Sequence, residues 1–222
     1  MLRALLSASP VVERIEMSKS LTLSSIALLL ASAAPAFAAS NVDLTVKGLI
    51  TPNACTPTVS AGGVVDHGKI ASKDLVQNNP TTLPRVTLQL SIDCDATIPF
   101  AIKPIDNRSG SSISSTNFGL GFVNGNKKLG RFYLTPKNMV ADGVAVQPIA
   151  SSDGGRTWYD EWAWELQTLW GAGAMDDATT LLPIKNLVMG LEVGTQINRA
   201  DQFDFSNETP IDGSATLEVV YL

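Results

Sequence analysis

Apolar residues recur at every second position over most of this chain, and that rhythm restricts it to β-strands. In a strand, successive side chains point to opposite faces, so a period of two marks a strand with one buried face. The clearest run spans residues 83–94, where apolar Val86, Leu88, Leu90 and Ile92 alternate with polar neighbours. Beyond residue 38 no stretch carries the helical period, so the sequence predicts an all-β protein.

The remaining strands are predicted between clusters of turn residues. Asn124-Gly125 is a strong signal for a hairpin. Residues 171–180 are small and acidic without apolar rhythm, so we expect a loop there. Strands are expected over 118–123, 129–134, 144–149, 162–166, 186–197 and 215–222. Short strands at such intervals favour an antiparallel β-sandwich, here one domain over residues 51–222.

The N-terminus has the features of a secretion signal over residues 1–38. Lys19 precedes the apolar run 21–30, and Ala36-Phe37-Ala38 fits the small-residue cleavage site. Glu13 and Glu16 are unusual before such a signal, so we expect translation to start at Met17. A retained membrane anchor is the weaker alternative, because spanning a bilayer takes about 20 apolar residues. We therefore expect an exported protein.

Charge and cysteine content narrow the function further. The chain has 16 basic and 21 acidic residues, and a net charge of −5 argues against nucleic acid as a partner. Cys55 and Cys94 are the only cysteines, and in an exported protein such a pair is typical of one disulfide. Closing a loop of about 40 residues would stabilise the fold by about 4 kcal/mol. Two cysteines and one histidine do not predict a metal site.

No catalytic residue or cofactor is predicted. His67 is the single histidine, and Asp66 would face the opposite side of a strand. Two carboxylate pairs could in principle serve glycoside hydrolysis, Asp93 with Asp95 and Asp176 with Asp177. Solvated charges that protect sheet edges explain both pairs more simply. We therefore expect a protein that is not an enzyme.

The tryptophans form a second candidate site. All four lie within one short segment, at Trp158, Trp162, Trp164 and Trp170. Such a cluster could form a platform for a glycan ligand. The alternative is that Trp162 and Trp164 fill the core while the other two cover its ends. Two coplanar exposed rings would favour the glycan platform.

Residues 39–50 would begin the exported chain as a free apolar strand. One face carries Val42, Leu44, Val46, Gly48 and Ile50. An exposed strand of this kind invites pairing with the edge of a sheet. We expect the segment to be inserted into a sheet.

The two ends and the cysteines resemble those of pilus subunits of the chaperone–usher pathway. Those proteins begin with an alternating apolar extension that contains one glycine, and a proline-containing junction and the first cysteine follow. Here the junction is 51–54, and Cys94 ends the long strand, as in the family. Pilus subunits also close on an alternating strand with an aromatic penultimate residue, which fits Ala215, Leu217, Val219 and Tyr221. Many carry a glycine fourteen residues from the end, where this chain has Thr209 and the nearest glycine is Gly213.

The resemblance implies an immunoglobulin-like sandwich that lacks its last strand. In the periplasm a chaperone would fill that gap, and the extension of a neighbouring subunit would then replace the chaperone. An outer-membrane usher would assemble the subunits into a fimbria on the cell surface of a diderm bacterium. The fimbria would support adhesion and biofilm formation. The alternative is a periplasmic or secreted carbohydrate-binding protein or adhesin that inserts its own strand and uses the segment 158–170.

Overall fold

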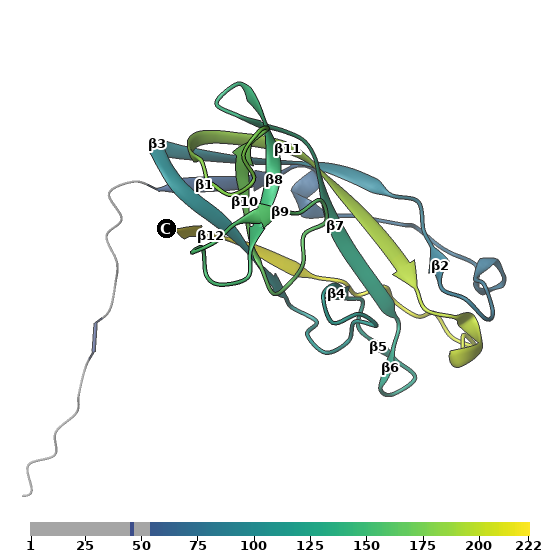
Figure 1. The fold of residues 1–222 in the computed structure, drawn as a ribbon. Helices are drawn as coiled ribbons and strands as arrows, with labels where there is room; N and C mark the ends of the chain where they lie inside the picture. Colours follow the sequence, from purple (N-terminus) through teal and green to yellow (C-terminus); the bar gives the residue numbers. More distant parts are fainter. Residues whose placement is uncertain (1–44, 47–53) are drawn as a thin grey trace, which may run out of the picture. The chain divides into compact units, whose positions relative to one another are not determined.

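The computed structural model describes residues 45–46 and 54–222, and its secondary structure is almost entirely β (Figure 1). The longer strands are β1 (Cys55–Val59), β3 (Val86–Asp106), β7 (Gly130–Ala141), β8 (Val144–Ser151), β10 (Leu169–Ala174), β11 (Pro183–Ile197) and β12 (Ala215–Tyr221). The two-residue strands are β2 (Thr81–Thr82), β4 (Phe118–Gly119), β5 (Phe122–Val123), β6 (Lys127–Lys128) and β9 (Tyr159–Asp160). Three short 3-10 turns complete these parts: η1 (Ser60–Gly63), η2 (Ser72–Asp74) and η3 (Ala200–Gln202). The all-β prediction is confirmed.

The long strand β3 organises the sheet. The first half of β3 pairs with β1 on one side and with β11 on the other. Leu90 is therefore paired with both Val59 and Met189. The second half of β3 pairs with β12, where Tyr221 is opposite Phe100, and it touches β10 through the pair Trp170 and Ile102. All of these ladders are antiparallel.

The strand pairings return to β3 rather than forming two separate layers. From β3 the path runs through β10, β8, β7 and β11 and back to β3. A strand of 21 residues is long enough to leave one face of the protein and continue on another. The architecture is a curved sheet that closes on itself, and the predicted two-layer sandwich is not confirmed.

Aromatic side chains fill the middle of the core. The Trp164 and Trp170 rings stack at 4.4 Å between centroids, and Phe118 stacks on Phe132 at 4.7 Å. Trp164, Trp170 and Phe118 are almost completely buried. Stacked rings of this size supply much of the apolar area that a core can bury.

One strand prediction and one loop prediction are wrong. The segment 162–166 has no strand and pairs with β7 at one isolated bridge, between Trp164 and Leu134, and Trp162 points outward instead of alternating inward. The predicted loop 171–180 begins as β10. Its small residues are required by packing: a Cβ on Gly171 would meet the Trp158 ring at 3.0 Å, and one on Gly173 would meet the Asp177 carbonyl oxygen at 2.7 Å.

The predicted hairpin is confirmed. Asn124 and Gly125 both have positive φ, at 46° and 94°, and β5 pairs with β6 across them. Asn and Gly tolerate this backbone conformation better than other residues, which is why the dipeptide predicts the turn.

The predicted signal 1–38 and most of the extension 39–50 lie outside the described residues. Of the five alternating residues only Val46 is described, and its side chain is 87% exposed. Across residues 54–222 the structure has no helix of the length and apolar character that crossing a bilayer requires.

Candidate functional site: an open apolar groove

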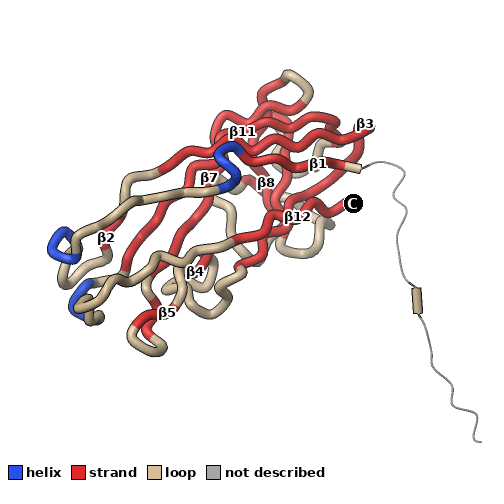
Figure 2. The backbone as a smooth tube through the Cα atoms, turned by 180° about the vertical axis from the view of Figure 1, so that it is seen from behind, coloured by secondary structure: helices blue, strands red, loops and turns tan. Residues whose placement is uncertain are grey.

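Two strands lie on the same side of the protein with unpaired edges (Figure 2). Within the described residues, β1 and β12 each pair with β3 and with no other strand. The other edge of β12 carries backbone groups with no partner strand, whereas on β1 the Cys55 N–H is bonded to Tyr221 and Pro57 has no N–H to offer. Such edges are templates for the addition of a further strand.

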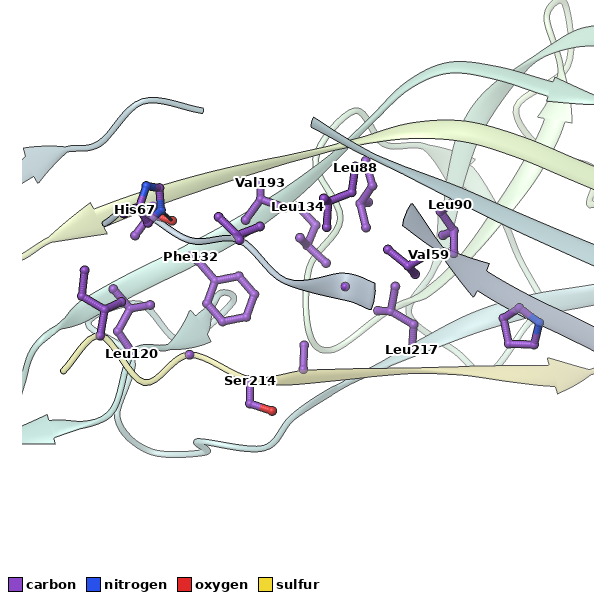
Figure 3. A pocket seen from close by; sticks show the side chains of 18 residues that line it. Val59, His67, Leu88, Leu90, Leu120, Phe132, Leu134, Val193, Ser214 and Leu217 are labelled. Atoms are coloured by element: carbon purple, nitrogen blue, oxygen red, sulfur yellow. Dashed lines mark hydrogen bonds between the residues drawn. The ribbon is translucent and has the colours of Figure 1, made fainter. Parts of the chain in front are cut away.

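A groove of about 470 Å³ opens between β1 and β12 onto the core. Its first wall comes from β1 and the segment that follows, and its second wall from residues 211–217. Its floor is apolar and comes from β3, β7 and β11, through Leu88, Leu90, Phe132, Leu134, Leu191 and Val193 (Figure 3). The half-buried apolar residues of the walls are Val59, Val65, Ala215 and Leu217. The arrangement suits an extended segment with apolar side chains at alternate positions.

Polar contacts cross the groove at both ends. At one end the backbone N–H of Cys55 donates to the Tyr221 hydroxyl at 2.9 Å. At the other end Lys69 Nζ lies 3.0 Å from Glu208 Oε1, and both of these side chains are more than nine-tenths exposed. Exposed ion pairs contribute only about 0–1 kcal/mol to stability, so the contact between Lys69 and Glu208 is the weaker of the two.

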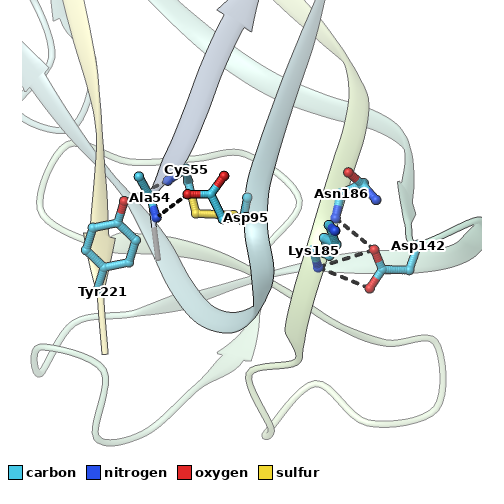
Figure 4. Close-up of a disulfide and its surroundings, with 8 residues drawn as sticks. Ala54, Cys55, Asp95, Asp142, Lys185, Asn186 and Tyr221 are labelled. Carbon is cyan, nitrogen blue, oxygen red and sulfur yellow. Dashed lines mark hydrogen bonds between the residues drawn. A yellow bond between two sulfur atoms is a disulfide. The ribbon is translucent and has the colours of Figure 1, made fainter. Parts of the chain in front are cut away.

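The disulfide fixes the first wall. Cys55 and Cys94 are bonded, as predicted, and they are paired residues of β1 and β3. Just before β1, the N–H of Ala54 donates to Asp95 Oδ2 at 3.2 Å (Figure 4). Because such bonds persist in oxidising compartments, the disulfide supports export of this protein.

A bidentate ion pair fixes the second wall. Arg108 Nε and Nη2 donate to the two carboxylate oxygens of Asp212 at 2.8 and 2.7 Å. These hydrogen bonds, together with the positive charge, lower the pKa of Asp212 from its ordinary value. Gly213 follows, and a Cβ there would lie 3.0 Å from Leu120 and 3.1 Å from Phe132. The wall backbone therefore rests directly on the floor at this level.

His67 extends from the first wall to the floor strand β11 (Figure 3). Its Nε2 lies 2.9 Å from the hydroxyl oxygen of Thr195, a buried residue of β11 that is paired with Phe132. The carboxylate of Asp66 instead accepts the N–H of Gly68. Sequence reasoning weighed His67 as a catalytic base against a histidine at the surface or a strand edge, and it missed the place of His67 in the groove, because the pairing with Thr195 joins residues far apart in the sequence.

A second cavity of about 330 Å³ adjoins the groove, and its lining is part apolar and part polar. It shares Ile211 with the main groove. Its apolar lining consists of Ile70, Leu75, Leu129, Ile197, Phe205 and Ile211.

The structure places the predicted C-terminal residues beside this groove. Ala215, Leu217, Val219 and Tyr221 are half-buried and pack against the core. Thr216 and Glu218 between them are exposed. The alternation expected from the sequence is therefore present over residues 215–219, whereas Val220 is also half-buried. Ala215 and Leu217 line the groove itself.

The four tryptophans do not form a surface platform. Trp164 and Trp170 lie in the core, and Trp158 is only 8% exposed, packed against Gly171. Trp162 alone is exposed, at 72%, which also contradicts its predicted place in the core. Burial of three rings leaves no coplanar exposed pair for a sugar to stack on.

The carboxylates considered for hydrolysis make local structural contacts. Asp95 accepts the N–H of Ala54, and Asp177 accepts the N–H and the hydroxyl of Thr179 at 2.8 and 2.7 Å. Hydrogen bonds from the Thr180 side chain, and then from the Thr179 side chain and backbone, lower the pKa of Asp177 to about 2. Within the described part of the chain, no three or more His, Cys, Asp or Glu residues are placed to hold a metal ion.

Comparison with known proteins adds sequence relatives. Residues 44–118 match a family described as a protein of unknown function (DUF1120). Over 221 residues the chain is 28% identical to the uncharacterized protein YhcF of Escherichia coli K12, covering 83% of this chain and 92% of YhcF. Over 81 residues it is 38% identical to protein GltF of the same organism, covering 33% of this chain and 31% of GltF. The chain is thus similar to YhcF over most of its length, and to the DUF1120 family over the segment with β1, the disulfide and β3.

Proposed function

We propose that this protein is a structural subunit of a surface fimbria, in which the groove of each copy accepts an apolar strand from its neighbour. The open groove between the unpaired edges of β1 and β12 is the observation that carries this proposal. The apolar wall residues Val59, Val65, Ala215 and Leu217 are only half-buried, and an inserted segment would remove their remaining surface from water.

The segment 42–50 has the chemistry to fill that groove. Strand addition joins backbone hydrogen bonds on both edges with pockets for alternate side chains. Full burial of Val42, Leu44, Val46 and Ile50 would contribute roughly 6–12 kcal/mol before costs, at about 1.5–3 kcal/mol for each side chain. The entropy lost on ordering the segment offsets a large part of this gain.

Export supports the same role. The disulfide fits an oxidising compartment, where a periplasmic chaperone would cover the groove until an outer-membrane usher delivers the next subunit. In this proposal the protein has no catalytic site, and its partners are other fimbrial subunits. Adhesion and biofilm formation would follow from the fibre at the cell surface.

Deletion of residues 39–50 tests the proposal. We expect the shortened protein to fold when it is co-expressed with the chaperone, because its own core is unchanged, but to donate no strand and to form no fibres. The measurement is the size of the assembled protein by analytical ultracentrifugation, with the urea midpoint as the measure of stability.

The full-length exported chain with Thr45→Ser is the matched control, since residue 45 lies on the other face of the alternating segment. A large loss of stability in a purified monomer on deletion would instead mean that each copy inserts its own strand. Unchanged assembly after deletion would contradict the proposal.

A further inference from the structure

The outer face of the sheet, on the side away from the groove, carries a second surface with its own chemistry. Phe132, Leu134 and Val193 line the groove, so Arg131 and Tyr133, which alternate with them on β7, lie on the other side of the sheet. Both of these residues are half-buried, and neither is part of the groove. A ligand bound to them would therefore leave the groove free.

The Tyr133 side chain lies across the neighbouring strand β11. Tyr133 is paired with Gly194, and a Cβ on that glycine would overlap the Tyr133 ring. The missing side chain at residue 194 thus allows the ring to rest on the backbone of β11. The guanidinium carbons of Arg85 and Arg131 lie 5.9 and 6.0 Å from the ring centroid, within the range of cation–π interactions. The face presents one aromatic ring with two cations beside it.

Among the described residues, only one of these two cations is paired with a carboxylate. Arg85 Nη1 donates to Glu192 Oε1 at 2.7 Å. Arg131 donates from Nε to Gln196 Oε1 and from Nη1 to Asn117 Oδ1, both at 2.9 Å, and both acceptors are neutral amides. Burying part of a charge costs free energy unless an opposite charge is close by. An anion that reached Arg131 would therefore be stabilised by a cation that has no carboxylate of its own in the described chain.

The two amides also orient the guanidinium of Arg131. They hold its plane from two directions, and Nη2 is left for a ligand. A planar guanidinium matches the two oxygens of a carboxylate better than a lysine ammonium does. Because the side chain is already ordered, a ligand loses less free energy in fixing it.

The surrounding groups have the mixed polarity that a sugar requires. Gln196 and Asn117 carry N–H donors as well as oxygens, and the exposed Thr82 and Thr87 of the neighbouring strands add hydroxyls. Sugar hydroxyls both donate and accept hydrogen bonds, whereas a carboxylate alone only accepts them. The Tyr133 ring adds an apolar surface for the C–H groups of a pyranose.

We propose that this outer face binds an acidic polysaccharide, with Arg131 pairing with the carboxylate of a uronic acid residue and Tyr133 packing against its sugar ring. The chain as a whole is acidic, with a net charge of −5, so the local arrangement and not the overall charge attracts the anion. This site takes no part in strand insertion, and its test is independent of the proposed function.

Calorimetric titration of the exported chain distinguishes the possible ligands. The probes are the hexamers of galacturonic and of mannuronic acid, with methyl-esterified hexagalacturonate as the uncharged sugar and hexaglutamate as the charged peptide. We expect at least one hexauronate to bind at least tenfold more tightly than both controls. Equal binding of hexaglutamate would mean that the face recognises acidic peptides, and it would overturn the assignment to a sugar. Equal binding of the ester, or no binding of either hexauronate, overturns the proposal.

Substitution tests the role of Arg131. Arg131→Gln should weaken binding of the hexauronate at least tenfold, and Arg131→Lys at least threefold, because lysine keeps the charge and loses the planar pair of donors. Arg156→Gln removes the same charge from the exposed loop after β8 and should change binding less than twofold. Tyr133→Leu should weaken binding at least threefold. Equal effects of Arg131→Gln and Arg156→Gln overturn the site.

Urea midpoints show whether each variant is folded, and an NMR titration of the wild type locates the ligand even where a variant does not fold. We expect the amide resonances of residues 131–133 and 194–196 to shift on addition of the hexauronate, and those of the loop 151–157 to stay in place. Shifts confined to other parts of the chain overturn the proposal.

Discussion

Single hydrogen bonds at the rim of the groove hold its walls in place. The contact between the Cys55 N–H and the Tyr221 hydroxyl connects the first and last strands of the described domain. It links the disulfide end of β1 directly to β12, so the penultimate aromatic residue has a structural role that the alternating pattern alone does not reveal.

Removing the Tyr221 hydroxyl should destabilise the domain modestly. We expect Tyr221→Phe to lower the free energy of unfolding by about 1 kcal/mol, because the half-buried N–H of Cys55 loses its acceptor. Urea denaturation followed by tryptophan fluorescence gives the measurement. Tyr159→Phe on β9 is the control, since Tyr159 is exposed and lies outside the groove. Equal effects of the two variants would contradict this role for Tyr221.

The second wall should loosen in acid through Asp212. Arg108 lowers the pKa of this carboxyl in the folded protein, so its contribution is present above the unfolded-state pKa of about 4. That contribution is lost as the pH falls through the lower folded-state pKa. We therefore expect Asp212→Asn to reduce the loss of stability between pH 5 and the acid limit of folding, measured by urea unfolding at each pH.

Asp74→Asn provides the control for this pH dependence. Asp74 is also exposed and lies beside a cation, with Lys73 Nζ at 3.4 Å, but it is outside the groove walls. If both variants changed the pH dependence equally, the bidentate pair with Arg108 would have no special role.

At the scale of strands, the alternating pattern predicted most elements correctly, and its failures have physical causes. The alternating pattern of residues 83–94 predicted the first half of β3, but the observed strand continues past Pro99 to Asp106. The pattern could not reveal β10, because Gly171 and Gly173 are small only to make room for Trp158, Ile149 and the Asp177 backbone. Those neighbours come from other parts of the chain.

A Cβ in β10 should therefore be costly. We expect Gly173→Ala to lower the free energy of unfolding by about 1–3 kcal/mol, because the new methyl group would meet backbone that cannot move aside easily. Gly190→Ala on β11 is the matched control, since its nearest neighbour is a Thr87 methyl at 3.3 Å. Urea midpoints of the two variants make the comparison, and equal losses would contradict this account of β10.

At the scale of the whole molecule, the groove could not be predicted from the sequence in full. The sequence identified the alternating apolar segment 42–50, the cysteine pair and the last strand. It therefore predicted that the segment 42–50 inserts into a sheet, without indicating where. It did not indicate that Thr195 and His67 meet. That contact depends on how β11 and the segment after β1 pack together, and a pattern of neighbouring residues in the sequence does not predict such packing.

Strand exchange between copies should make stability depend on concentration. Anything that binds the folded state and not the unfolded state raises the melting temperature by mass action. We expect the Tm of the exported chain to rise with protein concentration, and the variant Leu44→Asp to remove that dependence because a charge would enter the apolar groove. Differential scanning calorimetry over a hundredfold range of concentration provides the measurement. A constant Tm in the wild type would argue for insertion within one copy.

The bond between Cys55 and Cys94 has a mechanical consequence. Cys55 is the first residue of β1. Tension arriving along the N-terminal segment therefore meets a covalent link to β3 before it can shear the hydrogen bonds of β1. In a fibre of the kind proposed above, a pulling load would pass to the longest strand of the described domain, and β1 would stay attached until β3 itself yields.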